Sequence, residues 1–332
     1  MYKEASILFF YTETPLHAGS GSNVSHIDMP VQREKHTGYP IVQSSGVKGA
    51  FRHWVNGIEA KKNVVKYMFG PEPENNASSD HGGSMGFTDA HLLFFPVRSF
   101  YGGFAWITCP FVLNRFSRRL EMLDLAPLPT VDEIPDDKIV IEPDKFIADN
   151  DRVILEDFSF NVTKNQNENF STIADRLCND AIPVNNGFNY IKNSFKKRLA
   201  IVSDNTFKDF VTLSTEVVTR INIGENGVVK TGALWTQELL PCDCILYCMV
   251  IAKDIEDIFS AKESMDSLKK HICFNNESTI IQMGGDETVG RGILRIRLLS
   301  SDNSLDNKND KDKDKKEKKK AYNKKMKKKK GN

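Results

Sequence analysis

The stretch Pro15–Trp54 reads PLHAGSGSNVSHIDMPVQREKHTGYPIVQSSGVKGAFRHW, and it contains the main clues to the fold. Its first part is rich in Gly and Ser, which is typical of a loop, and then charged residues, His and Pro alternate densely. From residue 44 to 63 the pattern predicts a helix with Ser44 or Ser45 as its cap. The apolar residues that follow helical spacing are Val47, Phe51, Trp54, Val55 and Ile58.

Two cations lie on another face of this helix. Lys48 and Arg52 are four residues apart, so they are neighbours on the helix surface. Because like charges at this spacing repel mildly, an anionic partner is plausible.

Asp28, within HIDMP, has two interpretations. It is either a catalytic carboxylate or a turn residue ahead of Pro30, and the residues alone favour the turn. His17, in HAGSG, is either a partner of Asp28 or a residue that makes local hydrogen bonds. The ten residues of loop between them leave the question open.

Outside this stretch the chain alternates irregularly between strand and helix patterns. Two β-rich segments cover 85–97 and 102–116, and residues 122–150 resemble an irregular insertion. A long hairpin is predicted over 216–241, with its tip at Gly224–Gly227. The other expected elements are a first strand from residue 6, a helix at 170–181, a helix passing into strand at 188–202, a strand at 242–252, a helix at 254–273 and a final strand after residue 292. This order favours an α+β domain with insertions over a doubly wound parallel sheet.

Composition is that of a globular protein without a membrane span. The chain has 332 residues, of which 40% are hydrophobic and 27% charged. Its longest wholly apolar run, Cys244–Ala252, is far shorter than the roughly 20 residues that a spanning helix needs. The N-terminal segment MYKEASILFFYTET has no small-residue cleavage site, so we expect a cytoplasmic protein with no membrane partner.

Six cysteines raise the alternatives of core packing and zinc binding. Cys242, Cys244 and Cys248 fall in PCDCILYC, and alternation along a strand places them on one face. A zinc site requires a second closely spaced pair, whereas only the isolated Cys273 follows. The pattern favours buried cysteines that act as small hydrophobes.

The last 32 residues differ in composition from the rest. Residues 301–332 contain 14 Lys against 6 Asp plus Glu, a net charge of +8 within a chain of net +1. Such a segment is expected to be disordered, with residue 300 as the boundary of the folded domain. Its lysines either attract nucleic acid without sequence preference or form a solvated tail.

A Gly-rich loop, GGDETVGRG, spans residues 284–292. Glycines allow a close approach of backbone to a ligand, but the GK[ST] ending of a nucleotide-binding loop is missing. Arg291, followed by Arg295 and Arg297, favours a polyanion as partner. From its residues alone, the chain is an α+β protein that binds an extended anion.

The stretch Pro15–Trp54 also resembles the signature of the RAMP-superfamily backbone subunits of type III CRISPR effectors. FGPE at Phe69 and the segments Gly83–Phe116 and Gly284–Gly292 are similar, more narrowly, to the type III-B family, the fourth subunit of the Cmr complex. The resemblance covers most of the first 300 residues and excludes the Lys-rich tail.

This resemblance implies a ferredoxin-like, RRM-related palm with an inserted hairpin, called the thumb, at about 215–241, and a further helical insertion. It implies a filament of several copies along the CRISPR RNA, together with other Cmr subunits. Each thumb then displaces a nucleotide, and a complementary single-stranded target RNA is cut at regular intervals with a divalent metal ion, Mg or Mn, bound only with RNA.

The resemblance also implies roles for individual residues. Asp28 falls on the essential aspartate, which acts through a metal ion or by proton transfer, and His17 on the accompanying histidine. Glu238 is a further candidate for catalysis, although WTQELLP departs from the family's acidic pair followed by an aromatic residue. The expected RNA-binding residues are Ser45, Lys48, Arg52, Arg220, Gly284, Gly285 and Arg291.

Two other functions are compatible with the sequence. One is a structural scaffold that binds CRISPR RNA while the chemistry takes place elsewhere in the complex. The other is a free-standing RNA-binding protein that depends on its basic tail.

Overall fold

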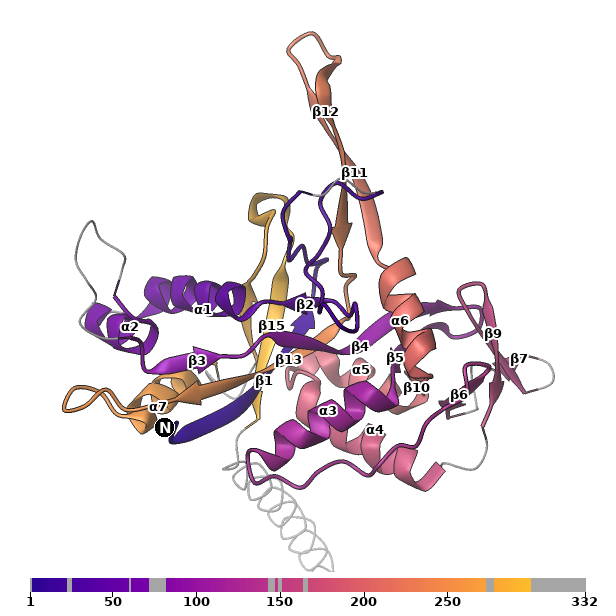
Figure 1. The fold of residues 1–332 in the computed structure, drawn as a ribbon, viewed down its shortest axis with the longest axis horizontal. Helices are drawn as coiled ribbons and strands as arrows, with labels where there is room; N and C mark the ends of the chain where they lie inside the picture. The colour runs from indigo at the N-terminus through magenta and orange to yellow at the C-terminus, as the bar shows by residue number, and fades with distance from the viewer. Residues whose placement is uncertain are drawn as a thin grey trace, which may run out of the picture.

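The computed structural model describes residues 2–22, 26–59, 61–71, 82–142, 147–148, 151–163, 167–272 and 278–299 (Figure 1). Within these ranges, thirteen strands form one sheet and two strands form a separate hairpin. The mixture of one large sheet with helices confirms the predicted α+β class.

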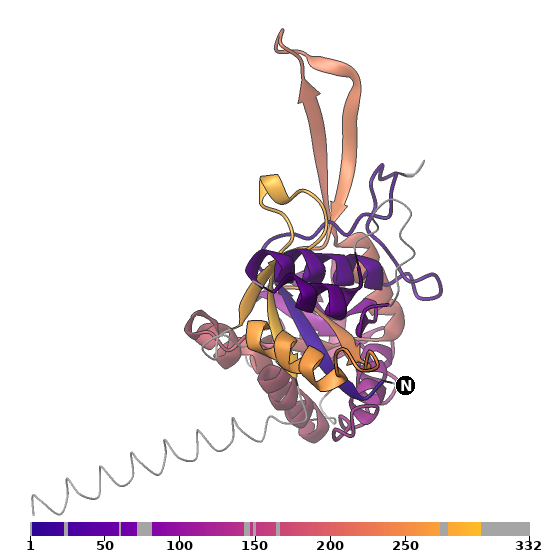
Figure 2. The same cartoon turned by 90° about the vertical axis from the view of Figure 1, so that its left-hand side faces the viewer.

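Four antiparallel strands form the centre of the sheet. In spatial order they are β15 (Ile293–Leu299), β1 (Glu4–Thr12), β13 (Ile245–Ala252) and β4 (Ala90–Ser99). Helix α1 (Ser44–Ile58) lies between β1 and β4 in the chain, and α7 (Ala261–Ile272) lies between β13 and β15. The two helices lie side by side on one face of the sheet (Figure 2), where His271 of α7 contacts Trp54 and Glu59.

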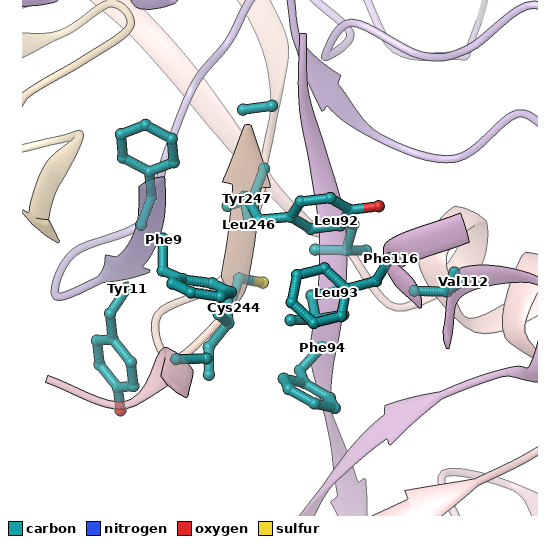
Figure 3. Packing of buried hydrophobic residues seen from close by; sticks show 14 of the residues in the cluster. Phe9, Tyr11, Leu92, Leu93, Phe94, Val112, Phe116, Cys244, Leu246 and Tyr247 are labelled. Carbon is teal, nitrogen blue, oxygen red and sulfur yellow. The ribbon is translucent and has the colours of Figure 1, made fainter. Parts of the chain in front are cut away.

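Strand β1 is covered on both faces, which explains its unbroken apolar run. Phe10 packs against Phe51 of α1, with ring centroids 6.2 Å apart. Its neighbour Phe9 points to the other face and packs at 5.7 Å against Phe116, which also contacts Tyr247 of β13 (Figure 3). Since successive residues of a strand point to opposite faces, a strand buried on both sides has no polar alternation.

The sheet continues from β4 into a second region. Its strands, in order, are β5 (Gly103–Thr108), β10 (Leu199–Ile201), β6 (Lys138–Ile141), β9 (Phe158–Val162), β8 (Arg152–Leu155) and β7 (Ile147–Ala148). The helices of this region are α3 (Pro110–Glu121), α4 (Asn167–Ala181), α5 (Asn189–Arg198) and α6 (Asp204–Leu213). The remaining elements are β2 (Ile41–Val42), α2 (Lys62–Phe69), β3 (Met85–Phe87), β14 (Thr279–Gln282) and the short 3-10 turns η1 (Asn186–Phe188) and η3 (Glu287–Val289).

The predicted hairpin is confirmed. Strands β11 (Glu216–Ile223) and β12 (Val229–Leu239) pair only with each other among the described strands and rise alone above the body (Figures 1 and 2). The tip turns where Gly227 donates its amide to the carbonyl of Gly224, with Gly227 at φ +74°. An L-residue with a side chain rarely adopts that conformation.

Three predictions about the elements were wrong. Residues 110–116, placed in a β-rich segment, belong to α3, because Pro110 starts the helix and Leu113, Phe116 and Leu120 are buried at helical spacing. The supposedly irregular segment 122–150 contributes β6 and β7. The helix predicted from residue 254 begins only at Ala261.

The start of α1 also differs from the prediction. Its cap is Gln43 rather than a serine, and the carboxylate of Asp89 accepts the amide of Ser44 at 2.7 Å. Ile58 is exposed instead of lying on the apolar face. A side chain from a distant loop therefore satisfies the helix end that a local serine was expected to satisfy.

Cys244 and Cys248 are buried, as the core interpretation predicts, and burial raises the pKa of both thiols. Cys242 precedes β13 in a turn and is only half-buried, so the predicted alternation does not reach it. Cys273 and residues 301–332 lie outside the described residues. No helix in the described part of the chain has the length and apolar character needed to cross a membrane.

Candidate active site at the base of the hairpin

One edge of β12 pairs with β11, and the other edge holds the loop that carries Asp28. Leu240, just after β12, exchanges two backbone hydrogen bonds with Leu16, of 2.8 and 2.9 Å. The amide of Met29 donates to the carbonyl of Thr236, and the amide of Glu238 donates to the carbonyl of Met29, both at 3.0 Å. Residues 16–22 and 26–31, hereafter the Asp28 loop, are thus seated against the base of the hairpin.

Asp28 is exposed, and Thr236 orients its carboxylate. The Thr236 amide and hydroxyl donate to Oδ2 of Asp28 at 2.7 and 2.9 Å, and the Asp28 amide donates back to the hydroxyl at 3.0 Å. The bond from the Thr236 amide and then the bond from its hydroxyl lower the pKa of Asp28. Asp28 is therefore ionised at neutral pH, with one oxygen engaged by the hairpin.

His17 is bound to the same strand. Its Nδ1 lies 2.7 Å from the carbonyl oxygen of Glu238 and, because a carbonyl only accepts, Nδ1 carries the proton. In the neutral ring the lone pair is then on Nε2. Thr236 and Glu238 are two residues apart, so the anchors of Asp28 and His17 are about 7 Å apart along β12. The ring is 5% exposed.

Glu238 is 2% exposed, and its carboxylate is engaged inside the protein. Oε2 accepts the amide of Val31 at 2.9 Å, and Oε1 accepts the Thr215 hydroxyl at 2.8 Å and the Arg33 guanidinium at 2.5 Å. The carboxylate therefore fastens the Asp28 loop to the hairpin, which is a positioning role.

The glycines of the Gly-rich loop pack closely against residues 15–17. Gly285 donates its amide to the carbonyl oxygen of His17 at 2.9 Å. A Cβ on Gly284, which has φ +82°, would lie 2.5 Å from that same oxygen. A Cβ on Gly292 would lie 1.9 Å from the carbonyl oxygen of Met283, so only glycine fits at either position.

The Gly-rich loop also meets the hairpin through side chains. Gln237, 3% exposed, donates from Nε2 to Asp286 at 2.6 Å and accepts from Arg220 at 3.4 Å. The Arg220 guanidinium lies 3.6 Å from the same Asp286 oxygen. Arg291 faces Glu216 on β11, where burial raises the pKa of the carboxyl and the charge of Arg291 partly opposes this rise.

Of the three candidates on α1, Ser45 lies in the first turn, whereas Lys48 and Arg52 lie further along the helix. Ser45 is exposed, and Lys48 is half-buried with its ammonium 3.1 Å from the carbonyl oxygen of Met85. Burial lowers the pKa of Lys48, and the nearby charges of Arg52 and Lys253 lower it further. Positive charge is therefore concentrated around Lys48 and Arg52, in the middle part of α1.

Gln32 joins this helix to the Asp28 loop. Its side-chain oxygen accepts the amide of Gln43, the α1 cap, at 2.7 Å, and its side-chain nitrogen donates to the carbonyl of Gly19 at 2.9 Å. The structure thus brings Asp28, His17, Glu238, Gly284, Gly285, Arg220 and Arg291 together at the base of the hairpin. Ser45, Lys48 and Arg52 are connected to them through Gln32.

The sequence model of the RAMP superfamily matches residues 9–295. The chain belongs to the RAMP superfamily. It is 35% identical over 304 residues to the CRISPR system Cmr endoribonuclease Cmr4 of Pyrococcus furiosus, covering 91% of this chain and 98% of that protein. It is 26% identical over 311 residues to the CRISPR system CMR subunit Cmr4 of Saccharolobus solfataricus, covering 88% and 96% of the two.

The fold of this RAMP-superfamily chain is similar to the crystal structure of oligomeric Cmr4 from Pyrococcus furiosus. The two superpose with a TM-score of 0.67 at 28% identity, and the match covers 89% of this chain and 97% of the other. The match therefore extends over nearly the whole of the solved relative.

Two features of this RAMP-superfamily site have no signal in the sequence. Thr236 pairs with Asp28 across 208 residues, so no local pattern connects them. Glu34, within the charged run QREKH, is buried and bound to Arg115 and to His91, whose Nδ1 lies 2.7 Å from its carboxylate. Runs of charge usually face solvent, which is why the sequence does not predict this buried cluster.

The site suits a metal ion that is shared with RNA. In the described part of the chain, no three His, Cys, Asp or Glu side chains gather as a metal-binding group. Asp28 is an exposed, ionised carboxylate whose Oδ2 alone is held by Thr236. Mg²⁺ binds through one or two carboxylates plus substrate phosphates, and a single carboxylate on an exposed loop fits that arrangement.

Proposed function

We propose that this chain is an RNA-guided endoribonuclease and the backbone subunit of a type III-B CRISPR effector complex. Several copies bind along one CRISPR RNA, with other Cmr subunits, and cut complementary single-stranded target RNA. The observation that carries the proposal is Asp28, an ionised carboxylate displayed at the base of an exposed hairpin and fixed there by Thr236. The 35% identity to a protein named Cmr endoribonuclease Cmr4 supports it.

The guide RNA binds along the positive surfaces around the hairpin base. Ser45 at the start of α1 and the cations Lys48 and Arg52 further along it contact backbone phosphates, since helix N-termini and cations favour anions. Arg220, Arg291 and the backbone of Gly284 and Gly285 supply a second contact. These groups position RNA without reading its sequence, which base pairing with the guide reads instead.

The target strand is cut by attack of a 2′-hydroxyl on the adjacent phosphorus. The O2′–P bond forms, the P–O5′ bond breaks, the 2′ proton leaves to a base and the 5′ oxygen gains a proton. His17, with its lone pair on Nε2, is suited to one of these proton transfers once the loop shifts to expose it. The lowered pKa of Asp28 makes it a weak base and favours a role in binding charge.

A divalent metal ion, Mg or Mn, would be held by Asp28 and the RNA phosphates, where it would stabilise negative charge on the scissile phosphate. Thr236 keeps the Asp28 carboxylate in one orientation for this purpose. Glu238 acts as a positioning residue, because its oxygens are engaged by Val31, Arg33 and Thr215.

In this proposal residues 1–300 form the RNA-binding domain, and the Lys-rich residues 301–332 are not part of it. The strand order β15-β1-β13-β4, with α1 and α7 as crossovers, supports a ferredoxin-like, RRM-related palm. The hairpin is then the thumb, which enters the guide–target duplex and kinks one nucleotide for in-line attack. A complex of this kind acts on RNA in the cytoplasm.

The decisive test is cleavage of complementary RNA by complexes assembled with Asp28→Ala. We expect normal assembly and guide binding, with cleavage reduced by about 100-fold or more, as for loss of a charge-stabilising group. Undiminished cutting by fully assembled complexes would remove Asp28 from the chemistry.

The burial of His17 and Glu238 favours one alternative, a scaffold that binds CRISPR RNA without cutting it. Under this alternative Asp28→Ala changes nothing, while Lys48→Ala or Arg52→Ala abolishes guide binding. The two functions are thus separated by the same set of variants.

A further inference from the structure

Three hydrogen bonds, together with two pairs of neighbouring residues, form a closed ring at the base of the hairpin. The Asp286 carboxylate accepts a hydrogen bond from the Gln237 side chain at 2.6 Å. The carbonyl oxygen of Glu238, the next residue of β12, accepts a hydrogen bond from Nδ1 of His17. The His17 carbonyl in turn accepts the amide of Gly285, which is the neighbour of Asp286. The ring therefore passes through β12, the Asp28 loop and the Gly-rich loop, and returns to its start.

The members of this ring on β12 and in the Asp28 loop leave little room for independent movement. Gln237, Glu238 and His17 are each no more than 5% exposed. Gly284 and Gly285 approach His17 so closely that a Cβ on Gly284 would collide with its carbonyl oxygen. Since packed interiors have few voids, a displacement of one member forces the others to move or to break a hydrogen bond.

β12 binds the Asp28 loop through its backbone and the Gly-rich loop through a side chain. The carbonyl of Thr236 and the amide of Glu238 bind Met29 of the Asp28 loop, while the side chain of Gln237 binds the Gly-rich loop. Asp286 adopts φ +64°, a conformation that residues with a Cβ rarely adopt, and its contacts with Gln237 and Arg220 stabilise it. The three residues 236–238 are thus a common anchor for both loops.

We propose that Gln237 and Asp286 are positioning residues that couple the Gly-rich loop to the Asp28 loop across β12. The coupling holds the Gly-rich loop in the shape that accepts guide RNA and holds Asp28 at its place beside the hairpin. The RNA part of this inference rests on the proposed function, whereas the mechanical coupling does not.

The test is a charge exchange in the full-length chain. Gln237→Glu places a second carboxylate beside the partly buried Asp286, where two like charges repel. In Gln237→Glu/Asp286→Asn the amide and the carboxylate are exchanged, so one hydrogen bond between them is restored. Asp286→Asn alone keeps an acceptor for Gln237 but loses the charge that faces Arg220, so it measures the effect of that loss by itself. Gln237→Met, of similar size and without a donor, replaces Gln237→Glu if that variant does not fold.

Hydrogen–deuterium exchange of the free protein is measured first, without RNA. We expect Gln237→Glu to raise exchange in residues 283–292 and also in residues 28–31, and the double variant to restore both. Faster exchange in 283–292 with no change in 28–31 overturns the coupling. So does a folded double variant that fails to recover.

Guide RNA binding and target cleavage are measured next. We expect Gln237→Glu to weaken binding of a single-stranded guide RNA by about tenfold, with cleavage at saturating RNA also reduced, in line with coupling energies between contacting residues. The double variant should bind within about threefold of the unchanged chain. If complexes assembled with the unchanged chain neither bind nor cut RNA, the proposed function fails while the exchange result still decides the coupling.

Discussion

Thr236 and Asp28 are joined by three hydrogen bonds, although 208 residues separate them in the chain. Two of these bonds end on the same carboxylate oxygen, so Thr236 fixes the direction in which the other oxygen points. The hairpin therefore does more than project from the body, because its base also orients the carboxylate. A change in the position of the hairpin is transmitted directly to Asp28.

Replacing Thr236 with Val should weaken cleavage without abolishing it. Val removes the hydroxyl but keeps the backbone donor at Oδ2 of Asp28, so the carboxylate is held by one bond instead of two. We expect target cleavage to fall by about tenfold, the effect of one charge-assisted hydrogen bond, with guide binding unchanged. Single-turnover cleavage of complementary RNA gives the rate, and Thr236→Ser should restore it.

Thr219→Val is the matched control for this variant. Thr219 lies directly opposite Thr236 on β11, so the same substitution is made on the same face of the hairpin. Equal losses of activity in the two variants would assign the effect to the hairpin surface instead of to the orientation of Asp28.

Glu238→Gln should lower the free energy of unfolding and should not act directly on the step that cuts RNA. The substitution leaves the Arg33 guanidinium without its carboxylate partner in a buried site. Breaking such a pair typically costs about 3–5 kcal/mol, so we expect a lower free energy of unfolding in urea titrations. Removing both charges in Arg33→Met/Glu238→Gln should recover part of this loss, together with cleavage. A stable double variant without any activity would instead support a direct catalytic role for Glu238.

The parts of the fold with a strong local pattern could be predicted from the sequence. β1, α1 and the β11–β12 hairpin follow their apolar spacing and turn residues. α3 was missed because Pro110 and a short apolar run fit either a strand or a helix, and only packing against β1 decides between them.

The site was predictable only in part, for a related reason. Asp28 and His17 were assigned through the family motif, whereas no local pattern predicts that both are anchored to β12. Hydrogen bonds between residues more than 200 positions apart depend on the completed fold. The roles of Glu238 and of the glycines in holding His17 became visible only with those contacts.

Lowering the pH should destabilise the protein, because the Glu34 carboxylate becomes protonated. Burial would raise the pKa of this carboxyl, but hydrogen bonds from His91, Arg115 and Thr37 together lower it from 4.5 to about 2. A lowered pKa contributes stability above the unfolded value, and this contribution is lost as pH falls from about 4.5 towards 2. At neutral pH it amounts to about 3 kcal/mol.

Glu34→Gln should therefore lower the free energy of unfolding by about 3 kcal/mol at pH 7 and flatten its decline below pH 4.5. Urea unfolding at a series of pH values measures both effects. Glu156→Gln is the control, because Glu156 pairs with Arg98, whose side chain is 69% exposed, and surface pairs contribute about 0–1 kcal/mol. If both variants keep the acid sensitivity of the unchanged chain, the Glu34 cluster is not its source.

The exposed apolar face of the hairpin should matter for target RNA and not for folding. Ile221 and Leu234 are paired across the two strands and are 47% and 63% exposed. The next pair towards the body on the same face is Thr219 and Thr236, so this apolar pair is about 7 Å from the residue that holds Asp28. When the hairpin enters the guide–target duplex, this apolar pair would separate stacked bases next to the Asp28 carboxylate.

Ile221→Ser/Leu234→Ser should leave the free energy of unfolding within about 0.5 kcal/mol of the unchanged value, as for exposed positions in general. Guide binding should persist, because the phosphate-binding groups on α1 and in the Gly-rich loop are untouched. Cleavage of target RNA should fall by about tenfold or more, since bases that remain stacked are not held in line for attack. Tyr190→Ser, at a 72% exposed position on α5, controls for loss of surface apolar area. Normal cleavage by the Ile221/Leu234 variant would mean that the hairpin acts through its backbone, with Asp28 and Thr236 alone setting the site of cutting.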